Sequence, residues 1–455
     1  VMDPDDHIVI IGAGFSGTLL AINLLRHKGP NATLIDRHAD QIARGIAYSS
    51  PHQSQLLNVR AKGMSPFPDD PDHFVRWVEA ERGGAPTSFV PRAAYGAYLT
   101  DVLARARGEQ PGRLTLREAA ATDIVATDDG RQAVVLNDGT RIVADVIVLA
   151  TGNLPPHTPD GIDPVSLPDG CYVEDPWRSD PADGLGTDDV VMLLGTGLTA
   201  VDVALELDAA GFGGTVLALS RRGLSPRRHV DAQIQAEPLH DPPALPLSHV
   251  VAAVRRRATG IDWRSAVDAL RPVTQRFWHG ADVATRARFL RHLRPYWDVH
   301  RHRLAPAVAD RIDAMQTDGA LRFAAGKVTR VMTEGSHLRV HWRPRHADAE
   351  VQIRVARIVN CTGPQGDLTR SDDPLLGTLY RRGLIRPDAL RIGLDVTPQS
   401  RVIAADGTPA DALYCIGPMT RGGLWEVVAV PDLRRQCWDL ARRLSNAQWI
   451  GGEGL

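Results

Sequence analysis

The sequence contains few cysteines, and no two of them lie close together. The four, Cys171, Cys361, Cys415 and Cys437, form no C-x-x-C pair in 455 residues. An enzyme that exchanges disulfides needs two neighbouring thiols, so this spacing argues against that class. Widely separated thiols are typical of a reducing compartment, and we therefore expect a cytoplasmic protein.

Lysine is nearly absent as well. Only Lys28, Lys62 and Lys327 occur among 52 Lys and Arg residues, so a single Arg is weak evidence for a binding site in this chain. The formal net charge of -2 indicates no affinity for nucleic acid. No apolar run approaches the length of a membrane span, and the acidic segment 1–6 does not resemble a signal peptide. We therefore expect neither nucleic acid nor membrane among the partners.

The chain is long enough for two or three domains, and its first part contains a recognisable unit. Residues 7–11 predict a buried strand. The pattern G-x-G-x-x-G follows directly, with its glycines at Gly12, Gly14 and Gly17. A helical pattern comes next, and a second strand ends at Asp36. This order is that of a dinucleotide-binding βαβ unit, whereas a lone glycine-rich turn would be weak evidence.

Each part of this unit has a physical task. Gly12 permits the tight turn, Gly14 lets the backbone approach a pyrophosphate, and Gly17 lets the helix pack closely on the strand. The helix N-terminus offers free N–H groups to phosphates, and Asp36 can accept hydrogen bonds from ribose hydroxyls. The candidate cofactor-binding residues here are Gly12, Gly14, Ser16, Gly17, Asp36 and Arg37.

A second glycine-rich turn follows the apolar strand at residues 190–194. It reads G-x-G-x-x-A, with Gly195, Gly197 and Thr199 as candidate cofactor-binding residues. The next strand ends in Ser220-Arg221-Arg222, where the first unit has its acid. An acid would repel a 2′-phosphate, whereas a hydroxyl and guanidinium groups would bind it, so we expect NADPH rather than NADH. The alternative is that both arginines belong to a solvated turn.

The two halves of the chain repeat one architecture. In each, the glycine-rich turn precedes short strands with turn residues and then a buried strand that ends in Thr-Gly, at Thr151-Gly152 and at Thr362-Gly363. A repeated order is a stronger signal than either turn alone. We expect an α/β fold of two Rossmann-like dinucleotide-binding domains with β-meanders, the second inserted in the first. The expected domains are 1–180 with 355–455, and 181–354.

Several longer segments, together with this order, carry a family resemblance. They are G-I-A-Y-S at 45–49, L-L-N-V at 56–59, M-S-P-F-P-D-D-P at 64–71, G-L-T-A-V-D at 197–202, S-R-R-G at 220–223, R-P-Y-W-D-V-H-R-H-R at 294–303 and L-W-E-V-V-A-V-P at 424–431. The chain resembles FAD-NAD(P)-binding flavoproteins of the YdhS type, and more broadly the ornithine and lysine N-hydroxylases and flavin monooxygenases. The resemblance implies that the first turn binds FAD and the second binds NAD(P)H.

The resemblance also assigns residues near the flavin. The strand ending at Gly417 resembles the one that returns to the flavin, although Pro418 stands where many relatives have Asp. We expect a helix to begin near Trp425 and Glu426 with its N-terminus toward the flavin. Glu426 is either a proton-transfer group or a first-turn carboxylate that complements the helix dipole. Asn58 either hydrogen-bonds flavin or substrate, or belongs to a loop turn.

Residues from about 239 to 312 break the repeated pattern and predict a helical insertion in the NADPH domain. Its basic run includes Arg286, Arg288, Arg291 and Arg294. The run is either a cap that captures an anionic substrate or a helix face that is solvated or salt-bridged, and the Arg-rich composition favours the second. His300 and His302 have no completing Cys or carboxylate set nearby, so we expect no metal site.

The pairing of FAD and NADPH sites predicts an oxidoreductase. We expect an NADPH-dependent FAD monooxygenase that N-hydroxylates a small amine or amino acid through a flavin C4a-hydroperoxide, with O₂ and a small-molecule substrate as partners. Asn58 and Glu426 are the candidate catalytic residues. The alternative is an NADPH-dependent reductase that passes electrons to a small acceptor or a partner protein. A non-enzymatic FAD-binding sensor would have no use for the second turn. The sequence leaves the substrate and a homo-oligomeric state open.

Overall fold

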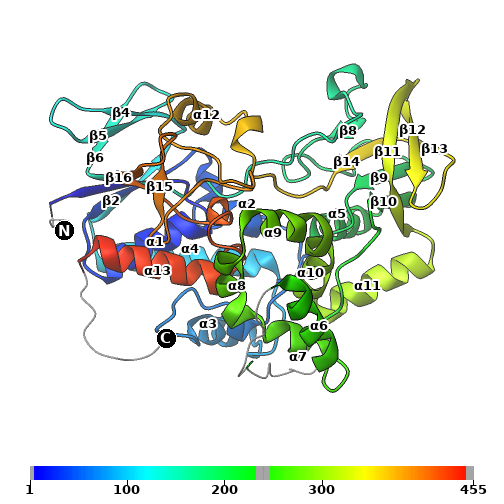
Figure 1. Ribbon diagram of the computed structural model, residues 1–455, viewed down its shortest axis with the longest axis horizontal. Helices are drawn as coiled ribbons and strands as arrows, with labels where there is room; N and C mark the ends of the chain where they lie inside the picture. The colour runs from blue at the N-terminus through cyan, green and yellow to red at the C-terminus, as the bar shows by residue number, and fades with distance from the viewer. Residues whose placement is uncertain (1–4, 232–238, 240–245, 447–455) are drawn as a thin grey trace. The chain divides into compact units, whose positions relative to one another are not determined.

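The structure is a computed structural model of the chain, and it describes residues 5–231, 239 and 246–446 (Figure 1). Its contacts divide the chain into two compact units. The first comprises Val1–Pro51, Val59–Leu154 and Gly366–Leu455, and the second comprises His52–Asn58 and Pro155–Gln365. The second unit thus interrupts the first in sequence, which confirms the inserted-domain fold class.

A six-stranded sheet with the strand order β15-β16-β7-β1-β2-β3 forms the centre of the first unit. The strands are β1 (His7–Ile11), β2 (Asn31–Asp36), β3 (Leu114–Glu118), β7 (Val146–Leu149), β15 (Arg401–Ile403) and β16 (Pro409–Cys415). Strand β1 pairs in parallel with β2 and β7, and β7 pairs in parallel with β16. β1 is an almost unbroken apolar run, because a parallel strand is covered on both faces.

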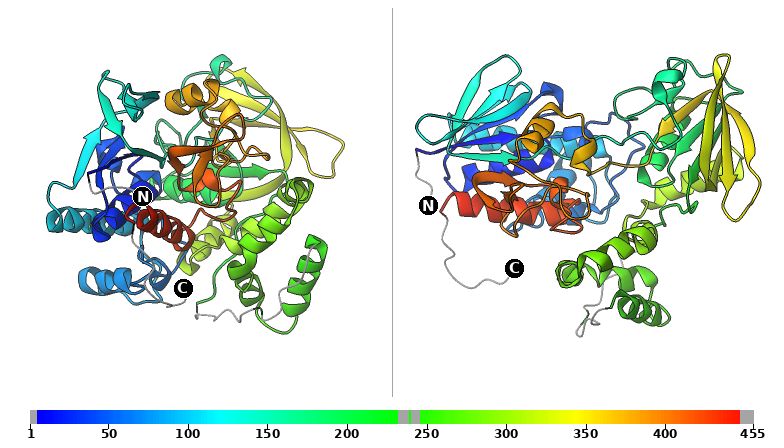
Figure 2. Two further views of the ribbon diagram at one scale, coloured as in Figure 1. Left: turned by 60° about the vertical axis from the view of Figure 1, so that its left-hand side comes forward. Right: turned by 45° about the horizontal axis from the view of Figure 1, so that its top comes forward.

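Different elements cover the two faces of this sheet (Figure 2). On one side, α1 (Phe15–Arg26) packs against α4 (Arg92–Glu109) and α13 (Val430–Leu444). On the other, an antiparallel meander and a helix share a core with the inner side chains of β1. These elements are β4 (Ala121–Ala126), β5 (Gln132–Leu136), β6 (Arg141–Ala144) and α12 (Pro374–Arg381). The expected meander of the first domain is therefore present.

The second unit repeats this plan with a seven-stranded sheet in the order β13-β12-β11-β10-β9-β14-β8. The strands are β8 (Tyr172–Val173), β9 (Val190–Leu194), β10 (Thr215–Ser220), β11 (Leu321–Glu334), β12 (His337–Pro344), β13 (Val351–Val355) and β14 (Arg357–Asn360). β9, β10 and the first part of β11 are parallel, whereas β11, β12 and β13 form an antiparallel meander. Helix α5 (Leu198–Ala209) connects β9 to β10.

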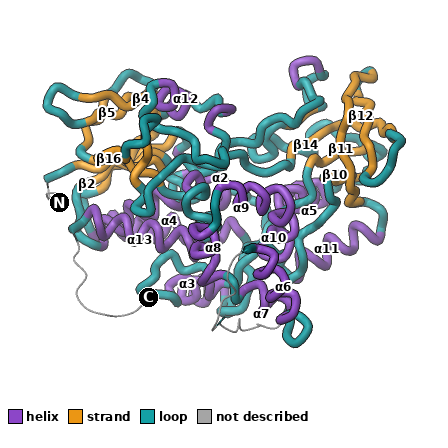
Figure 3. Tube along the Cα trace, viewed as in Figure 1, coloured by secondary structure: helices purple, strands orange, loops and turns teal. Residues whose placement is uncertain are grey.

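From Leu247 onward, the chain between β10 and β11 is mostly helical, as Figure 3 shows in purple. They are α6 (Leu247–Arg257), α7 (Trp263–Asp268), α8 (Thr274–Gly280), α9 (Val283–Arg288), α10 (Arg294–Arg301) and α11 (Pro306–Thr317). The expected helical insertion is confirmed, although residues 240–245 lie outside the described part. Within it, Arg286 donates to the carbonyls of Trp278 and Ala281, and Arg294 pairs with Asp298 at 3.3 Å. These contacts favour a structural role for the basic run.

The boundaries of the second unit differ from the expected 181–354. Residues 155–180 and 355–365 belong to it, because β8 pairs with β14 and β14 pairs with β9. The guanidinium of Arg357, 9% exposed, also donates to the carbonyls of Gly170, Pro181 and Asp183. These contacts could not be predicted from the sequence, because Gly170 and Arg357 lie nearly two hundred residues apart.

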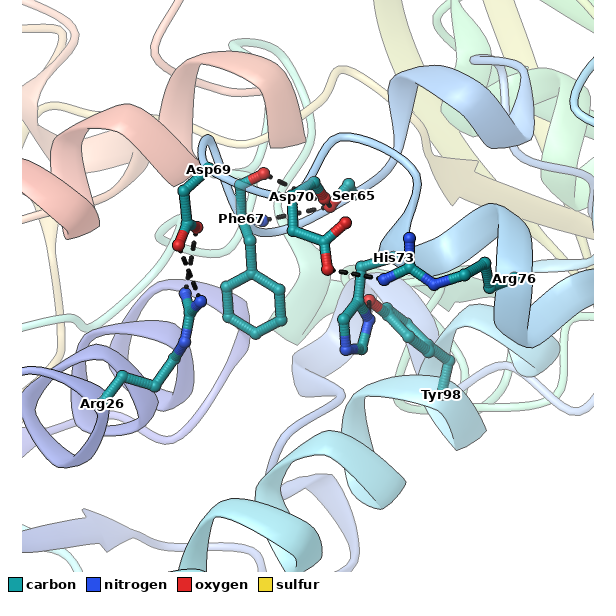
Figure 4. Close-up of polar contacts among 8 residues, drawn as sticks. All are labelled: Arg26, Ser65, Phe67, Asp69, Asp70, His73, Arg76 and Tyr98. Atoms are coloured by element: carbon teal, nitrogen blue, oxygen red, sulfur yellow. Dashed lines mark hydrogen bonds and ion pairs between the residues drawn. The ribbon is translucent and has the colours of Figure 1, made fainter. Parts of the chain in front are cut away.

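The segment at residues 64–71, part of the family resemblance, is fixed by side chains of the first unit (Figure 4). Arg26 of α1 pairs with Asp69 at 2.9 Å, and its guanidinium lies 4.2 Å from the centroid of the Phe67 ring. Asp70 pairs with Arg76 of α3 (His73–Arg82) at 2.6 Å. The hydroxyl of Ser65 donates to the carbonyl of Asp70. These residues have a structural role, because their polar groups are directed at one another.

Three half-buried histidines of the first unit predict a pH-dependent stability. Burial lowers the pKa of His7, His27 and His73 below the ordinary value of 6.5. The unfolded chain then binds more protons than the folded one as the pH falls below 6.5, so acidification decreases the free energy of unfolding. We expect the midpoint of urea unfolding to decrease between about pH 7 and about pH 5, and His73→Gln to weaken that decrease.

The exposed His38 provides the control variant His38→Gln, which should leave the decrease as it is in the wild type. An unchanged pH slope in His73→Gln would contradict the assignment.

Candidate functional site

The first glycine-rich turn leads from β1 into α1 and is shaped by two close backbone approaches. A Cβ at Gly12, whose φ is +104°, would lie 2.3 Å from the carbonyl oxygen of Ala150. A Cβ at Gly17 would lie 1.9 Å from the carbonyl oxygen of Gly12. A Cβ at Gly14 would have more room, because its nearest neighbour would be the Cα of Gly45 at 3.6 Å. The turn is therefore tightly packed at Gly12 and Gly17, whereas the backbone at Gly14 has room beside it. A backbone that approaches a pyrophosphate needs such room.

The N-terminus of α1 offers donors at this turn. Its N-cap is Gly14, which provides no side-chain cap, so the first N–H groups of the helix are not capped by a side chain. By contrast, Asp373 caps α12 and accepts from the backbone N–H of Leu376. Asp36 accepts from the N–H of Ala13 at 2.7 Å and from the N–H of His38 at 3.1 Å. These bonds orient the carboxylate at the end of β2, where a ribose would bind.

Other residues approach the same turn from later in the chain. Strand β16 runs beside β7 and places Gly417 near Ser16, where a Cβ at Gly417 would lie 3.1 Å from Oγ of Ser16. The side chain of Gln436 on α13 accepts from the N–H of Gly417 at 2.8 Å and donates to the hydroxyl of Thr420 at 3.1 Å. Gln436 was not identified from the sequence, because a Gln in a helix carries no motif. It holds the loop in which Pro418 replaces the expected Asp.

The end of β7 presents a polar atom without a partner. Oγ1 of Thr151 is buried and forms no hydrogen bond in the structure. Gly152 follows with φ +70°, and a Cβ there would meet no atom within 4 Å. The corresponding Thr362 of the second unit does have a partner, since its hydroxyl donates to Oδ1 of Asn360 at 2.7 Å. An unpaired hydroxyl beside an accessible glycine turn fits residues that would hold FAD.

The segment around Trp425 and Glu426 differs from its expected structure. Helix α13 begins at Val430, after the N-cap Ala429, and not near Trp425. The backbone of Glu426 has φ +67°, a left-handed conformation that the first turn of a helix cannot contain. Glu426 is therefore no first-turn carboxylate, and the expected helix start was wrong. Trp425 is buried, at 6% exposure.

The second turn, between β9 and α5, repeats the geometry of the first. A Cβ at Gly195, whose φ is +129°, would lie 2.1 Å from the carbonyl oxygen of Cys361. Gly197 is the N-cap of α5 without a side-chain cap, and a Cβ on it would meet no atom within 4 Å. Thr199 lies in the uncapped first turn of α5, and Ala200 is buried at the third glycine position. This turn also fits a bound dinucleotide.

The three residues after β10 have different surroundings. Oγ of Ser220 lies 2.8 Å from Oγ1 of Thr196 and accepts from the N–H of Gly223, so its hydrogen bonds hold the turn. The guanidinium of Arg222 lies 5.1 Å from the centroid of the Tyr296 ring and donates to its hydroxyl at 3.2 Å. Arg222 therefore contacts the helical insertion. Arg221 instead lines a pocket.

That pocket contains cations that the sequence did not identify. Its lining residues are Arg221, Gly326, Lys327, Arg343, Pro344, Arg345, His346 and Ala347. No role for Lys327 was predicted from the sequence, in which the rarity of lysine is the only signal of it. Strand pairing is what places Lys327 beside Arg221.

Two predicted cofactor residues have partners elsewhere in the structure. Arg37 pairs with Asp373 at 2.9 Å, so its guanidinium is engaged with the N-cap of α12. Asn58 belongs to the second unit, and its carbonyl lies 2.9 Å from Nε2 of His229. The flavin roles of both residues stay predictions.

Within residues 5–231, 239 and 246–446, no three His, Cys, Asp or Glu side chains are grouped as a metal ion would require. In the same part of the chain, none of the helices is both long enough and apolar enough to cross a membrane.

Comparison with known proteins agrees with this geometry. Residues 9–154 match the model of a protein family described as FAD-NAD(P)-binding. The chain is 24% identical over 271 residues to YdhS of Escherichia coli K12, an uncharacterized protein. The aligned part is 51% of this chain and 48% of YdhS, so the chain spans about half the length of the curated relative it matches.

Two solved structures cover nearly the whole chain. Ornithine hydroxylase PvdA from Pseudomonas aeruginosa is 14% identical with a TM-score of 0.63, and 97% of this chain and 99% of that chain are covered. L-lysine 6-monooxygenase from Pseudomonas syringae is 16% identical with a TM-score of 0.64 and the same coverage. At these identities the similarity shows the fold alone. Residues 9–154 therefore match an FAD-NAD(P)-binding domain, and the chain is similar to YdhS in sequence and to the ornithine and lysine N-hydroxylases in fold.

Proposed function

We propose that this protein is an NADPH-dependent FAD monooxygenase that N-hydroxylates a small amine or amino acid. The observation that carries the proposal is the pair of glycine-rich turns. Each ends at an uncapped helix N-terminus beside a glycine, Gly14 or Gly197, whose Cβ position has room for a ligand. Each turn can therefore receive one pyrophosphate, and two dinucleotides allow a hydride donor and a hydride acceptor in one chain.

In this proposal the residues of the first unit hold FAD. The N–H groups at Gly14 and the start of α1 bind the pyrophosphate, Asp36 binds the ribose, and Thr151 gains a hydrogen-bond partner. FAD supplies the acceptance of hydride and the activation of O₂. Gln436 positions the N–H of Gly417 next to Ser16, so the loop after β16 is held at the turn.

The residues of the second unit hold NADPH in this proposal. The turn at Gly195 and Gly197 receives the pyrophosphate, and Arg221 provides positive charge for the 2′-phosphate. Arg222 has a smaller part, because its guanidinium is already engaged with Tyr296.

We assign proton transfer to Glu426. Asn58 would donate or accept a hydrogen bond to flavin or substrate. The left-handed backbone of Glu426 supports the first assignment, because such conformations in residues other than glycine concentrate at functional sites.

A reaction through paired thiols is less well supported by the structure. All four cysteines are free and buried. Burial raises the pKa of Cys415 to about 12, so its thiolate is scarce near neutral pH. The proposed substrate class is supported by the likeness in fold to an ornithine hydroxylase and an L-lysine 6-monooxygenase.

The proposal is tested by measuring NADPH oxidation and O₂ uptake together. With FAD-loaded protein, an accepted amine should make the two rates equal and yield a hydroxylamine, without accumulation of hydrogen peroxide. L-ornithine and L-lysine are the first substrates to try. NADPH oxidation that continues without O₂ in the presence of an electron acceptor would identify a reductase and overturn the proposal.

A further inference from the structure

The cationic pocket of the second unit is built by strand pairing at one edge of the sheet. Strand β10 ends at Ser220, which is paired in parallel with Ala325 of β11. Arg221 therefore leaves the sheet at the same edge as Lys327, two residues beyond Ala325. Ligands of parallel α/β sheets bind outside the carboxyl ends of the strands, and this edge is such a place.

The neighbouring strand adds two more cations. In the antiparallel pair of β11 and β12, Lys327 lies directly opposite Arg343. The N–H of Arg345 donates to the carbonyl of Ala325 at 2.8 Å, so the chain after β12 stays close to the end of β11. Arg221, Lys327, Arg343 and Arg345 all line the pocket. Like charges directly opposite in a sheet destabilise it, so this arrangement weakens the protein when no anion is bound.

Acids do not offset this charge. Among the described residues, no salt bridge joins an Asp or Glu to Arg221, Lys327, Arg343 or Arg345. Elsewhere in the same unit, Arg339 on β12 pairs with Glu334, and Arg311 on α11 pairs with Asp208. Asp348 and Glu350, in the loop between β12 and β13, are not among the lining residues. An unpaired group of cations in a concave site is the composition that binds a phosphate.

We propose that the β11–β12 hairpin forms the 2′-phosphate subsite for NADPH, through Lys327 and Arg343 acting with Arg221. This inference rests on the proposed function, because it assumes that the second turn binds NADPH. It assigns the preference for NADPH over NADH mainly to the hairpin, which follows the second glycine-rich turn only after α5, β10 and the helical insertion. Arg222 contributes little, since Tyr296 holds its guanidinium.

The test measures binding of nucleotide fragments to the FAD-loaded protein by calorimetry. Adenosine 2′,5′-bisphosphate carries the 2′-phosphate, and 5′-AMP is the matched ligand without it. Lys327→Gln and Arg343→Gln should each raise the Kd of the bisphosphate about 10- to 100-fold, as Arg221→Ala should, because each removes a charge-assisted contact. The Kd of 5′-AMP should stay within a factor of about two.

The matched control is Arg330→Gln, on an exposed position of the same strand that does not line the pocket. It should leave both Kd values unchanged. A second readout separates binding from damage to the fold: without ligand, Lys327→Gln and Arg343→Gln should have a Tm equal to or above that of the wild type, because they relieve repulsion.

Equal effects on both nucleotides, or no effect on the bisphosphate, would overturn the inference. Competition by inorganic phosphate as strong as that of the bisphosphate would also overturn it, because the pocket would then be a general anion site. Failure of the proposed function would show in a different assay. Wild-type protein would then oxidise no NADPH, or would oxidise it without oxygen uptake.

Discussion

Gly14→Val is expected to yield folded protein that purifies without its yellow colour. A Cβ at this position meets only the Cα of Gly45, at 3.6 Å, and the φ of -70° is accessible to any residue. The fold should therefore tolerate the side chain, whereas a pyrophosphate bound at the uncapped start of α1 would collide with it. Losing the charge-assisted backbone contacts to the pyrophosphate should weaken FAD binding more than about 100-fold.

The matched variant is Gly197→Val in the second turn, where a Cβ meets no atom within 4 Å. It should keep its flavin absorbance near 450 nm, about the usual position for oxidised flavin, and lose reduction by NADPH. The measurements are the ratio of flavin to protein absorbance and the circular dichroism spectrum. A yellow Gly14→Val protein with full occupancy would refute the assignment of the first turn to FAD. Exchanged phenotypes would show that the two turns bind the opposite cofactors.

Gly17→Ala is expected to prevent folding, although it adds only one methyl group. The new Cβ would lie 1.9 Å from the carbonyl oxygen of Gly12, so it would force the start of α1 away from the turn after β1. We expect a loss of more than about 4 kcal/mol in the free energy of unfolding, in the range of severe core disruption. The protein should be insoluble or show no cooperative unfolding transition.

The control for Gly17→Ala is the same substitution at Gly108. Gly108 lies in α4 of the same unit, and a Cβ there meets no atom within 4 Å. Gly108→Ala should leave the free energy of unfolding unchanged or raise it by up to about 0.5 kcal/mol, because Gly108 lies in the last turn of α4, where glycine costs less than in a helix interior. Soluble Gly17→Ala protein with a Tm equal to that of the wild type would disprove the close approach of helix and turn.

Much of the site was predictable because its signals are local. The tasks assigned to Gly12, Gly14 and Gly17 depend on residues that follow one another in a strand, a turn and a helix. The same holds for Gly195 and Gly197. The structure gives each glycine the surroundings that its position in the motif requires: close backbone at Gly12, Gly17 and Gly195, and room at Gly14 and Gly197.

The predictions that failed or stayed incomplete depend on distant parts of the chain. The helix near Trp425 begins later because Glu426 adopts a left-handed backbone that the sequence does not signal. Arg221 and Arg222 are adjacent and alike in sequence, yet one lines the cationic pocket and the other contacts Tyr296 of α10. Gln436 reaches Gly417 only because α13 packs against α1 near the end of β16.

By itself, the sequence determined that two dinucleotide-binding βαβ units with meanders and a helical insertion occur in one chain. Hydrophobic periodicity and glycine spacing encode these features, because both act between residues that are neighbours in the chain. The tertiary structure alone decided which cations share a pocket, which arginine is engaged and where each unit ends. Those properties arise when strands such as β10, β11 and β12 align their registers, and register joins residues that lie far apart in the sequence.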